Sequence, residues 1–271
     1  MSPRAAATNV EPWDRRRLLA TLAGVLVVAL VMITGLGLAI YYAVTADGSA
    51  QDATAGETTI APGATGQQHR DQIAARPMLD VPPEAAQRGT PSAVPAKAIE
   101  IPAATKTGAA GVPTGFPMTP QGAAGQLAAI EANVMQGMSI PYTNEVYKHW
   151  ALPGGVGAAA WPLTRNVQAF LGSAGQGQSK ESTVTVTTTP VAAQIKGHDG
   201  KRWVVACVLM DVRAVITTQA RMAYGYCERM QWSTNGRWMI APGDSPTKAP
   251  STWPGTDLAA DAGWRTWVEK D

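Results

Sequence analysis

The chain has 271 residues, with 22 Lys or Arg against 20 Asp or Glu and a formal net charge of +2. In the C-terminal part no basic run is longer than Lys201-Arg202, so the sequence offers no phosphate-tracking stripe and we expect no direct nucleic-acid binding. Eight of the nine Trp residues lie after residue 149, which predicts that the folded domain is C-terminal.

An uncharged apolar stretch at residues 18–44 is long enough to cross a bilayer core of roughly 30 Å. Three arginines at 15–17 precede it and the next charge is Asp47, so the positive-inside rule places residues 1–17 in the cytoplasm. We therefore predict a single-pass cell-membrane protein with an extracytoplasmic C-terminal domain. The alternative is a cleaved signal peptide, although signal h-regions run about 7 to 15 residues.

Residues 45–114 contain no Phe, Trp or Tyr and are rich in Pro, Ala, Gly, Thr and Gln. Such a composition buries too little apolar surface to offset its ordering entropy. We predict a disordered linker here, followed by one domain over residues 115–271.

The domain begins with three predicted helices. Thr119 is a typical N-cap before Pro120, and apolar residues follow at helical spacing as far as Met138. A second helix is expected over residues 142–152, and a third from Trp161-Pro162 to about Gly172.

Strands follow after residue 177. Alternating Val and Thr predict a strand over 183–195, and further strands are expected over 202–216, 221–232 and 237–240, the last after the hairpin signal Asn235-Gly236. The predicted fold class is therefore α+β, a cup of about three helices packed on a curved four-stranded antiparallel sheet. A last short helix is expected within residues 256–268.

The two cysteines, Cys207 and Cys227, are equally far from a predicted turn near Thr217. A cross-strand disulfide here would close about 20 residues and stabilise the fold by about 3 kcal/mol. Two buried free thiols are the alternative.

Nothing in the sequence marks a catalytic centre. His69, His149 and His198 lack metal-ligand spacing, and His198-Asp199 is typical of turn chemistry. We expect no catalytic residue, no metal site and no cofactor, and therefore no enzyme.

Charged residues on neighbouring strands leave two interpretations open. Asp211, Arg213, Glu228 and Arg229 would either form cross-strand ion pairs or line a pocket in the cup. Several Trp residues would likewise pack the core or line a cleft. The candidate pocket residues are Trp150, Trp203, Asp211, Arg213, Glu228 and Trp232.

Four segments, 115–123, 227–232, 236–243 and 249–256, resemble actinobacterial single-span membrane proteins of integrative conjugative elements. The resemblance implies a cup similar to nuclear transport factor 2, as in scaffold subunits of type IV secretion channels. It implies a non-enzymatic scaffold that binds the membrane and other membrane or channel proteins. Some channel scaffolds carry two such domains and this chain shows one, which leaves homo-oligomer assembly open. The alternative function is a lipid-binding or small-molecule-binding accessory protein of a membrane transport system.

Overall fold

A computed structural model describes residues 66–216 and 218–270 of the chain. The predicted membrane span at 18–44 lies outside these ranges. Within them, none of the helices combines the length and the apolar character that crossing a bilayer requires.

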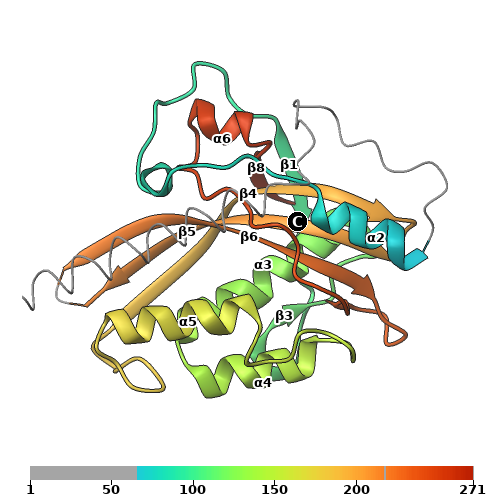
Figure 1. The fold of residues 1–271 in the computed structure, drawn as a ribbon, viewed down its shortest axis with the longest axis horizontal. Coiled ribbons are helices and arrows are strands. Elements are labelled where there is room, and N and C mark those ends of the chain that lie inside the picture. The colour runs from blue at the N-terminus through green and yellow to red at the C-terminus, as the bar shows by residue number, and fades with distance from the viewer. Residues whose placement is uncertain (1–65, 217, 271) are drawn as a thin grey trace, which may run out of the picture. The chain divides into compact units, whose positions relative to one another are not determined.

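The domain is built on one six-stranded sheet in the order β1-β8-β4-β5-β6-β7 (Figure 1). All neighbouring strands are antiparallel except β1 and β8, which are parallel. The strands are β1 (Ala98–Pro102), β4 (Thr185–Asp199), β5 (Trp203–Val215), β6 (Gln219–Trp232), β7 (Trp238–Ile240) and β8 (Arg265–Lys270). A separate antiparallel pair consists of β2 (Lys106–Thr107) and β3 (Pro113–Thr114).

The predicted α+β class with a curled, largely antiparallel sheet is confirmed, but the sheet is larger than expected. Strands β4 to β7 form the predicted four-stranded meander, and β8 and β1 extend it at one edge. The expected helix within 256–268 was wrong in its second half: α6 (Asp257–Asp261) is followed by β8. Gly263, with φ of +82°, lies where the helix gives way to the strand.

Three helices pack on one face of the sheet, which we call the inner face: α3 (Pro120–Gly137), α4 (Ile140–Trp150) and α5 (Pro162–Ser173) (Figure 1). The Thr119 hydroxyl accepts a hydrogen bond from the Gly122 N–H at 3.0 Å, as an N-cap does. Met138 ends α3 in the left-handed conformation, with φ of 39°. All three helices lie where the sequence predicts them.

The opposite, outer face of the sheet has its own smaller core. It is covered by α2 (Gly66–Ala75), by α6 and by the segments that follow each of them. Ile73 of α2, Trp203 and Leu209 of β5, and Trp264 before β8 are each at most 3% exposed. The sheet therefore lies between two layers, as Figure 1 shows.

The prediction of a disordered linker over residues 45–114 was wrong from residue 66 onwards. Residues 66–114 form α2, β1, β2, β3 and two short 3-10 helices, η1 (Pro83–Ala86) and η2 (Ala109–Gly111). Apolar side chains of this stretch pack into the two cores of the domain, and Ile101 and Val112 are fully buried in the inner one. The ordering entropy is offset by packing on other segments, which composition alone does not reveal.

Two irregularities bend β4 around the inner helices. The pairing of β4 with β5 shifts register between Pro190 and Ala192 and again between Ile195 and Gly197. Such bulges increase the local twist and bend a strand. At Gly197 an added Cβ atom would collide with Ile73 and Arg76, so the missing side chain lets α2 approach the sheet.

Candidate functional site

The six candidate pocket residues do not form one pocket, which corrects that hypothesis. Alternate residues of β5 and β6 point to opposite faces of the sheet. Trp150, Glu228 and Trp232 belong to the inner side, whereas Trp203, Asp211 and Arg213 belong to the outer face.

The cysteines lie in the register that the sequence predicts. Cys207 and Cys227 are direct partners across β5 and β6, and their sulfur atoms form a disulfide on the outer face. Both residues are buried, and the Cys227 Sγ lies 3.6 Å from the Met78 Sδ. The segment after α2 therefore covers the disulfide.

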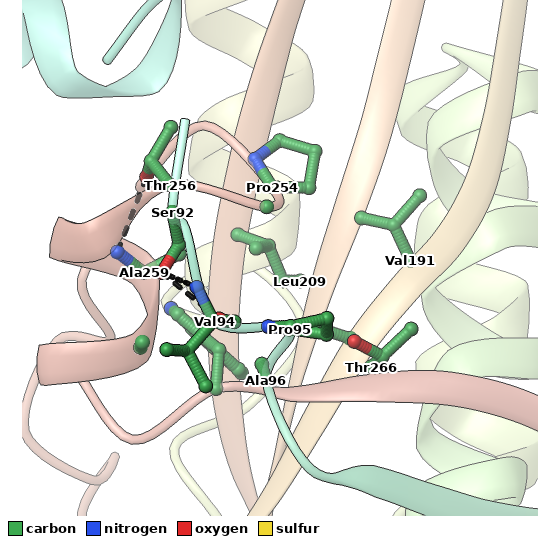
Figure 2. A pocket seen from close by; sticks show the side chains of 14 residues that line it. Ser92, Val94, Pro95, Ala96, Val191, Leu209, Pro254, Thr256, Ala259 and Thr266 are labelled. Atoms are coloured by element: carbon green, nitrogen blue, oxygen red, sulfur yellow. Dashed lines mark hydrogen bonds between the residues drawn. The ribbon is translucent and has the colours of Figure 1, made fainter. Parts of the chain in front are cut away.

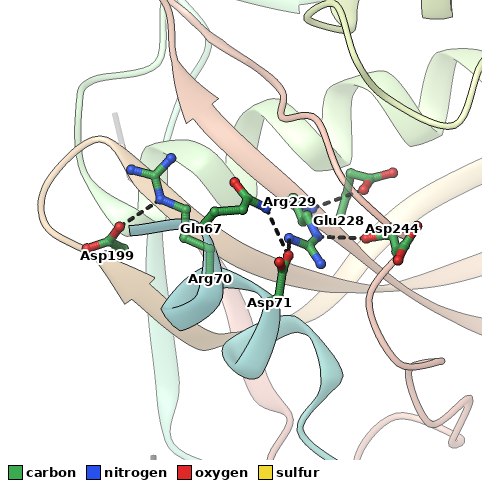
Figure 3. Close-up of polar contacts among 7 residues, drawn as sticks. All are labelled: Gln67, Arg70, Asp71, Asp199, Glu228, Arg229 and Asp244. Atoms are coloured by element: carbon green, nitrogen blue, oxygen red, sulfur yellow. Dashed lines mark hydrogen bonds and ion pairs between the residues drawn. The ribbon is translucent and has the colours of Figure 1, made fainter. Parts of the chain in front are cut away.

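On the outer face, charged residues hold segments of the chain against the sheet. Figure 3 shows the contacts of α2, where Arg70 pairs with Asp199 at 2.7 Å and Asp71 pairs with Arg229 at 2.6 Å. We call these two ion pairs the α2 clamp. Arg229 is only 4% exposed and also donates to the Asp244 carbonyl at 2.6 Å. The clamp thus fastens α2 and the chain after β7 to one buried guanidinium.

A second group of ion pairs lies near the end of β5 and β6 where the two strands are joined. Asp211 accepts two hydrogen bonds from Arg221, both 2.7 Å long, and one from Arg213 at 3.1 Å. The hydrogen bonds from Arg221 lower the pKa of Asp211, and Arg221 also stacks over Trp253 at 4.7 Å. Asp211 thus pairs with Arg221 across the two strands and with Arg213 along β5, and not with Glu228 or Arg229.

The inner face holds a polar cluster of which the sequence analysis singled out only Glu228: Glu131, Asn166, Tyr224, Tyr226 and Glu228. Glu131, Tyr226 and Glu228 are buried, and Asn166 and Tyr224 are partly exposed. The Tyr226 hydroxyl donates to Glu228 at 2.5 Å, and the Trp161 indole N–H donates to the same oxygen at 3.0 Å. The Asn166 amide donates to the Tyr224 hydroxyl. The two tyrosine rings stack, with 6.3 Å between their centroids.

Glu131 differs from Glu228 within this polar cluster. Glu131 on α3 is 0% exposed, and neither of its carboxyl oxygens finds a hydrogen-bond partner within the described ranges. Burial raises the pKa of Glu131 well above its ordinary value, and burial also raises the pKa of Glu228. Since a buried, unpaired carboxylate is very costly, Glu131 is expected to be neutral near pH 7.

A pocket of about 370 Å³, which we call the inner pocket, opens beside the polar cluster between α5 and the hairpin of β5 and β6. Asn166 and Tyr224 form its polar end, and Arg221 lies on its lining. Its apolar lining includes Met135, Leu163, Val167, Phe170, Val212 and Met222. The volume lies within the range typical of small-molecule sites.

A different pocket, of about 310 Å³, lies on the outer face (Figure 2). The segment Ser92–Ala96, α6 and the strands around Leu209 enclose it, and none of its lining residues has an ionisable side chain. Ser92 uses its hydroxyl group locally, on the backbone of Val94. This outer pocket offers apolar surface but little chemistry for recognition.

Two signals in the sequence point to the polar cluster. Glu131 follows Leu127 by four residues and precedes Met135 by four, so it interrupts the apolar face of α3. On β6, Tyr224, Tyr226 and Glu228 alternate and thus share one face of the strand. A charge inside an apolar helical face is the stronger of the two signals.

The polar cluster holds acids and phenols that donate or accept hydrogen bonds. Among the described residues no group of three or more His, Cys, Asp or Glu is placed to hold a metal ion. Comparison with known proteins adds nothing to this geometry, because no family model, no curated protein and no solved structure matches the chain. Its membership of a family therefore stays a prediction from the sequence.

Proposed function

We propose that this chain is a single-span membrane scaffold whose C-terminal domain lies outside the cell membrane and binds other proteins of a conjugative DNA-transfer or secretion apparatus. The observation that carries the proposal is the end of the β5–β6 hairpin. Val215, Ile216 and Met222 there are 41–43% exposed. We call these three residues the hairpin-tip patch.

The hairpin-tip patch stands out from the rest of the surface. Of the eight large apolar side chains that are exposed in the described part of the chain, three lie within these eight positions of sequence. Isolated exposed apolar residues are normal, but a cluster of them on one protruding element is typical of a protein interface. Figure 1 shows β5 and β6 as a long hairpin, and the three residues lie in sequence at the end where the two strands are joined.

The disulfide supports the proposed location of the domain outside the cell membrane. Disulfides persist in oxidising compartments outside the cytoplasm and are rare inside it. Cys207 and Cys227 are paired and buried on the outer face, which fits a domain that folds on the outer side of a membrane.

In-cell crosslinking of the full chain, followed by extraction and mass spectrometry, tests the proposal. We expect subunits of a conjugation or secretion channel, and we expect Ile216→Asp to reduce their recovery at least five-fold. Val94→Asp is the matched control, because Val94 is 73% exposed and far from the hairpin in sequence. Recovery of transport permease subunits instead of channel subunits would refute the scaffold function.

A further inference from the structure

The inner pocket is built like a binding site for a small molecule. Helices α3 and α5 form one wall and strands β5 and β6 the other. Along β6 the residues Ala220, Met222 and Tyr224 point to the same face and lead from the hairpin end towards the polar cluster. The pocket therefore has an apolar body with a polar inner end.

The polar end offers one donor and one acceptor. Because the Asn166 amide nitrogen already donates to the Tyr224 oxygen, the Tyr224 hydroxyl retains its own proton to donate. No described residue donates to the side-chain carbonyl oxygen of Asn166, so this oxygen can accept a hydrogen bond from a ligand. The same two residues also line a neighbouring pocket of about 240 Å³.

The polar end also lacks a free charge. Burial raises the pKa of Tyr224, with nearby Glu131 as a second cause, so the phenol stays protonated. Burial raises the pKa of Glu131 as well and so disfavours its charged form. Arg221 is the nearest cation on the lining, and Asp211 already binds it through two hydrogen bonds. A charged ligand group would lose its hydration here without meeting a counter-charge.

We propose that the inner pocket binds a small uncharged amphiphile, an alcohol or an amide with an alkyl or aryl body. The apolar body lies between α5 and the hairpin, and the polar group exchanges hydrogen bonds with Asn166 and Tyr224. This gives the alternative function predicted from the sequence a specific site. The site shares Met222 with the hairpin-tip patch and is otherwise built from different residues.

Photolabelling of the full chain in amphipol, free of detergent, tests the proposal. The probe is a ten-carbon alcohol that carries a diazirine on its alkyl chain, and peptide mass spectrometry locates the label. We expect the label on α5 and on residues 219–224 of β6. Ala169→Trp should reduce labelling at least five-fold, because Ala169 lies exposed on the lining of the pocket.

Gln168→Trp is the matched control, since the neighbouring residue is also exposed on α5 but does not line the pocket. It should leave labelling unchanged. Equal labelling of the Ala169→Trp and Gln168→Trp variants would overturn the proposal. A second outcome would also overturn it: the probe does not label the wild type, and the Ala169→Trp variant loses its protein partners in the crosslinking experiment. The pocket would then hold a side chain of a partner protein.

The polar end is tested separately with the probe's carboxylate analogue at pH 8 and its plain alkane analogue. The alcohol should label at least five-fold more than either one, and Asn166→Leu should abolish its advantage over the alkane. Asn166 is partly exposed, so this variant is expected to fold. Equal labelling by all three probes would overturn the assignment of a polar end.

Discussion

The two faces of the sheet carry different kinds of chemistry. On the outer face, ion pairs tie α2, which is distant in sequence, to the sheet, and a disulfide joins the neighbouring strands β5 and β6. Charges there, such as Arg229, meet opposite charges. On the inner face, carboxyl groups are buried without a cation, and a pocket opens beside them. The outer face therefore holds chain segments together through charge pairs, whereas the inner face buries carboxyl groups without an ion pair next to an open cavity.

Removing the disulfide should have the largest effect on this contrast. For the double variant Cys207→Ala and Cys227→Ala, we expect the free energy of unfolding to fall by about 3 kcal/mol, because the bond closes 20 residues of sequence. Urea unfolding of the full chain, followed by Trp fluorescence, measures it. Dithiothreitol should lower wild-type stability to the same level and leave the variant unchanged. A loss below about 1 kcal/mol would mean that packing alone closes the outer face.

Glu131→Gln should stabilise the inner face, and only at higher pH. The folded-state pKa of Glu131 lies above its unfolded value. The wild type is thus most stable below the unfolded pKa of about 4.3 and loses stability as the pH rises towards the folded pKa. The glutamine does not titrate. The free energy of unfolding of the variant, relative to that of the wild type, should therefore be about 2 kcal/mol higher at pH 8 than at pH 4.

Urea unfolding at the two pH values gives this difference directly. Glu145→Gln, which changes an exposed residue of α4, is the control and should show no such pH-dependent gain. If Glu131→Gln changed the free energy of unfolding equally at pH 4 and pH 8, ionisation of the Glu131 carboxyl group would not be the cause.

Asp71→Asn should loosen α2 without disturbing the sheet. The buried Arg229 would lose its ionic partner, but Asp71 is half exposed, so we expect a loss of about 1.5 kcal/mol. Hydrogen exchange should speed up in residues 66–75 and stay slow in β5. Asp80→Asn is the control, because Asp80 is exposed and lies five residues beyond α2. This variant should leave hydrogen exchange in both regions unchanged. Faster exchange in β5 would show that the clamp supports the whole domain.

Asp211→Asn should give the smallest effect and the opposite dependence on pH. Arg221 and Arg213 lower the pKa of Asp211, so its contribution is present above the unfolded pKa of about 3.9 and is lost as the pH falls through the folded pKa. Because the two arginines are 40% and 49% exposed, solvent screening limits the loss at pH 7 to about 0.5 kcal/mol. Near pH 2 the variant and the wild type should unfold alike. A larger loss at pH 2 than at pH 7 would contradict the assignment.

Local signals in the sequence were enough for most elements of the inner layer and the meander. Thr119 and Pro120 start α3, and Asn235-Gly236 turns β6 into β7, each through backbone preferences that act within a few residues. The strand β8 was missed because its partners, β1 and β4, lie far away in sequence. Order in residues 66–114 was missed for the same reason.

Once Cys207 and Cys227 are paired, the sequence alone predicts how the candidate pocket residues divide between the two faces of the sheet. Trp203, Asp211 and Arg213 lie an even number of positions from Cys207, so they share its face. Glu228 lies one position from Cys227 and therefore points the other way. The closeness of Glu131 to Tyr224 depends on how α3 crosses the sheet, which no local pattern specifies.

The parallel pairing of β1 with β8 has a consequence for the order of folding. Among the strands that the structure describes, β1 pairs only with β8, and β8, at residues 265–270, is the last of these strands to be made. During synthesis, β1 therefore stays without its partner strand until β8 has been made. Closing so long a loop is a slow, late step. The β1 edge of the sheet is therefore expected to form after β4, β5 and β6 have paired.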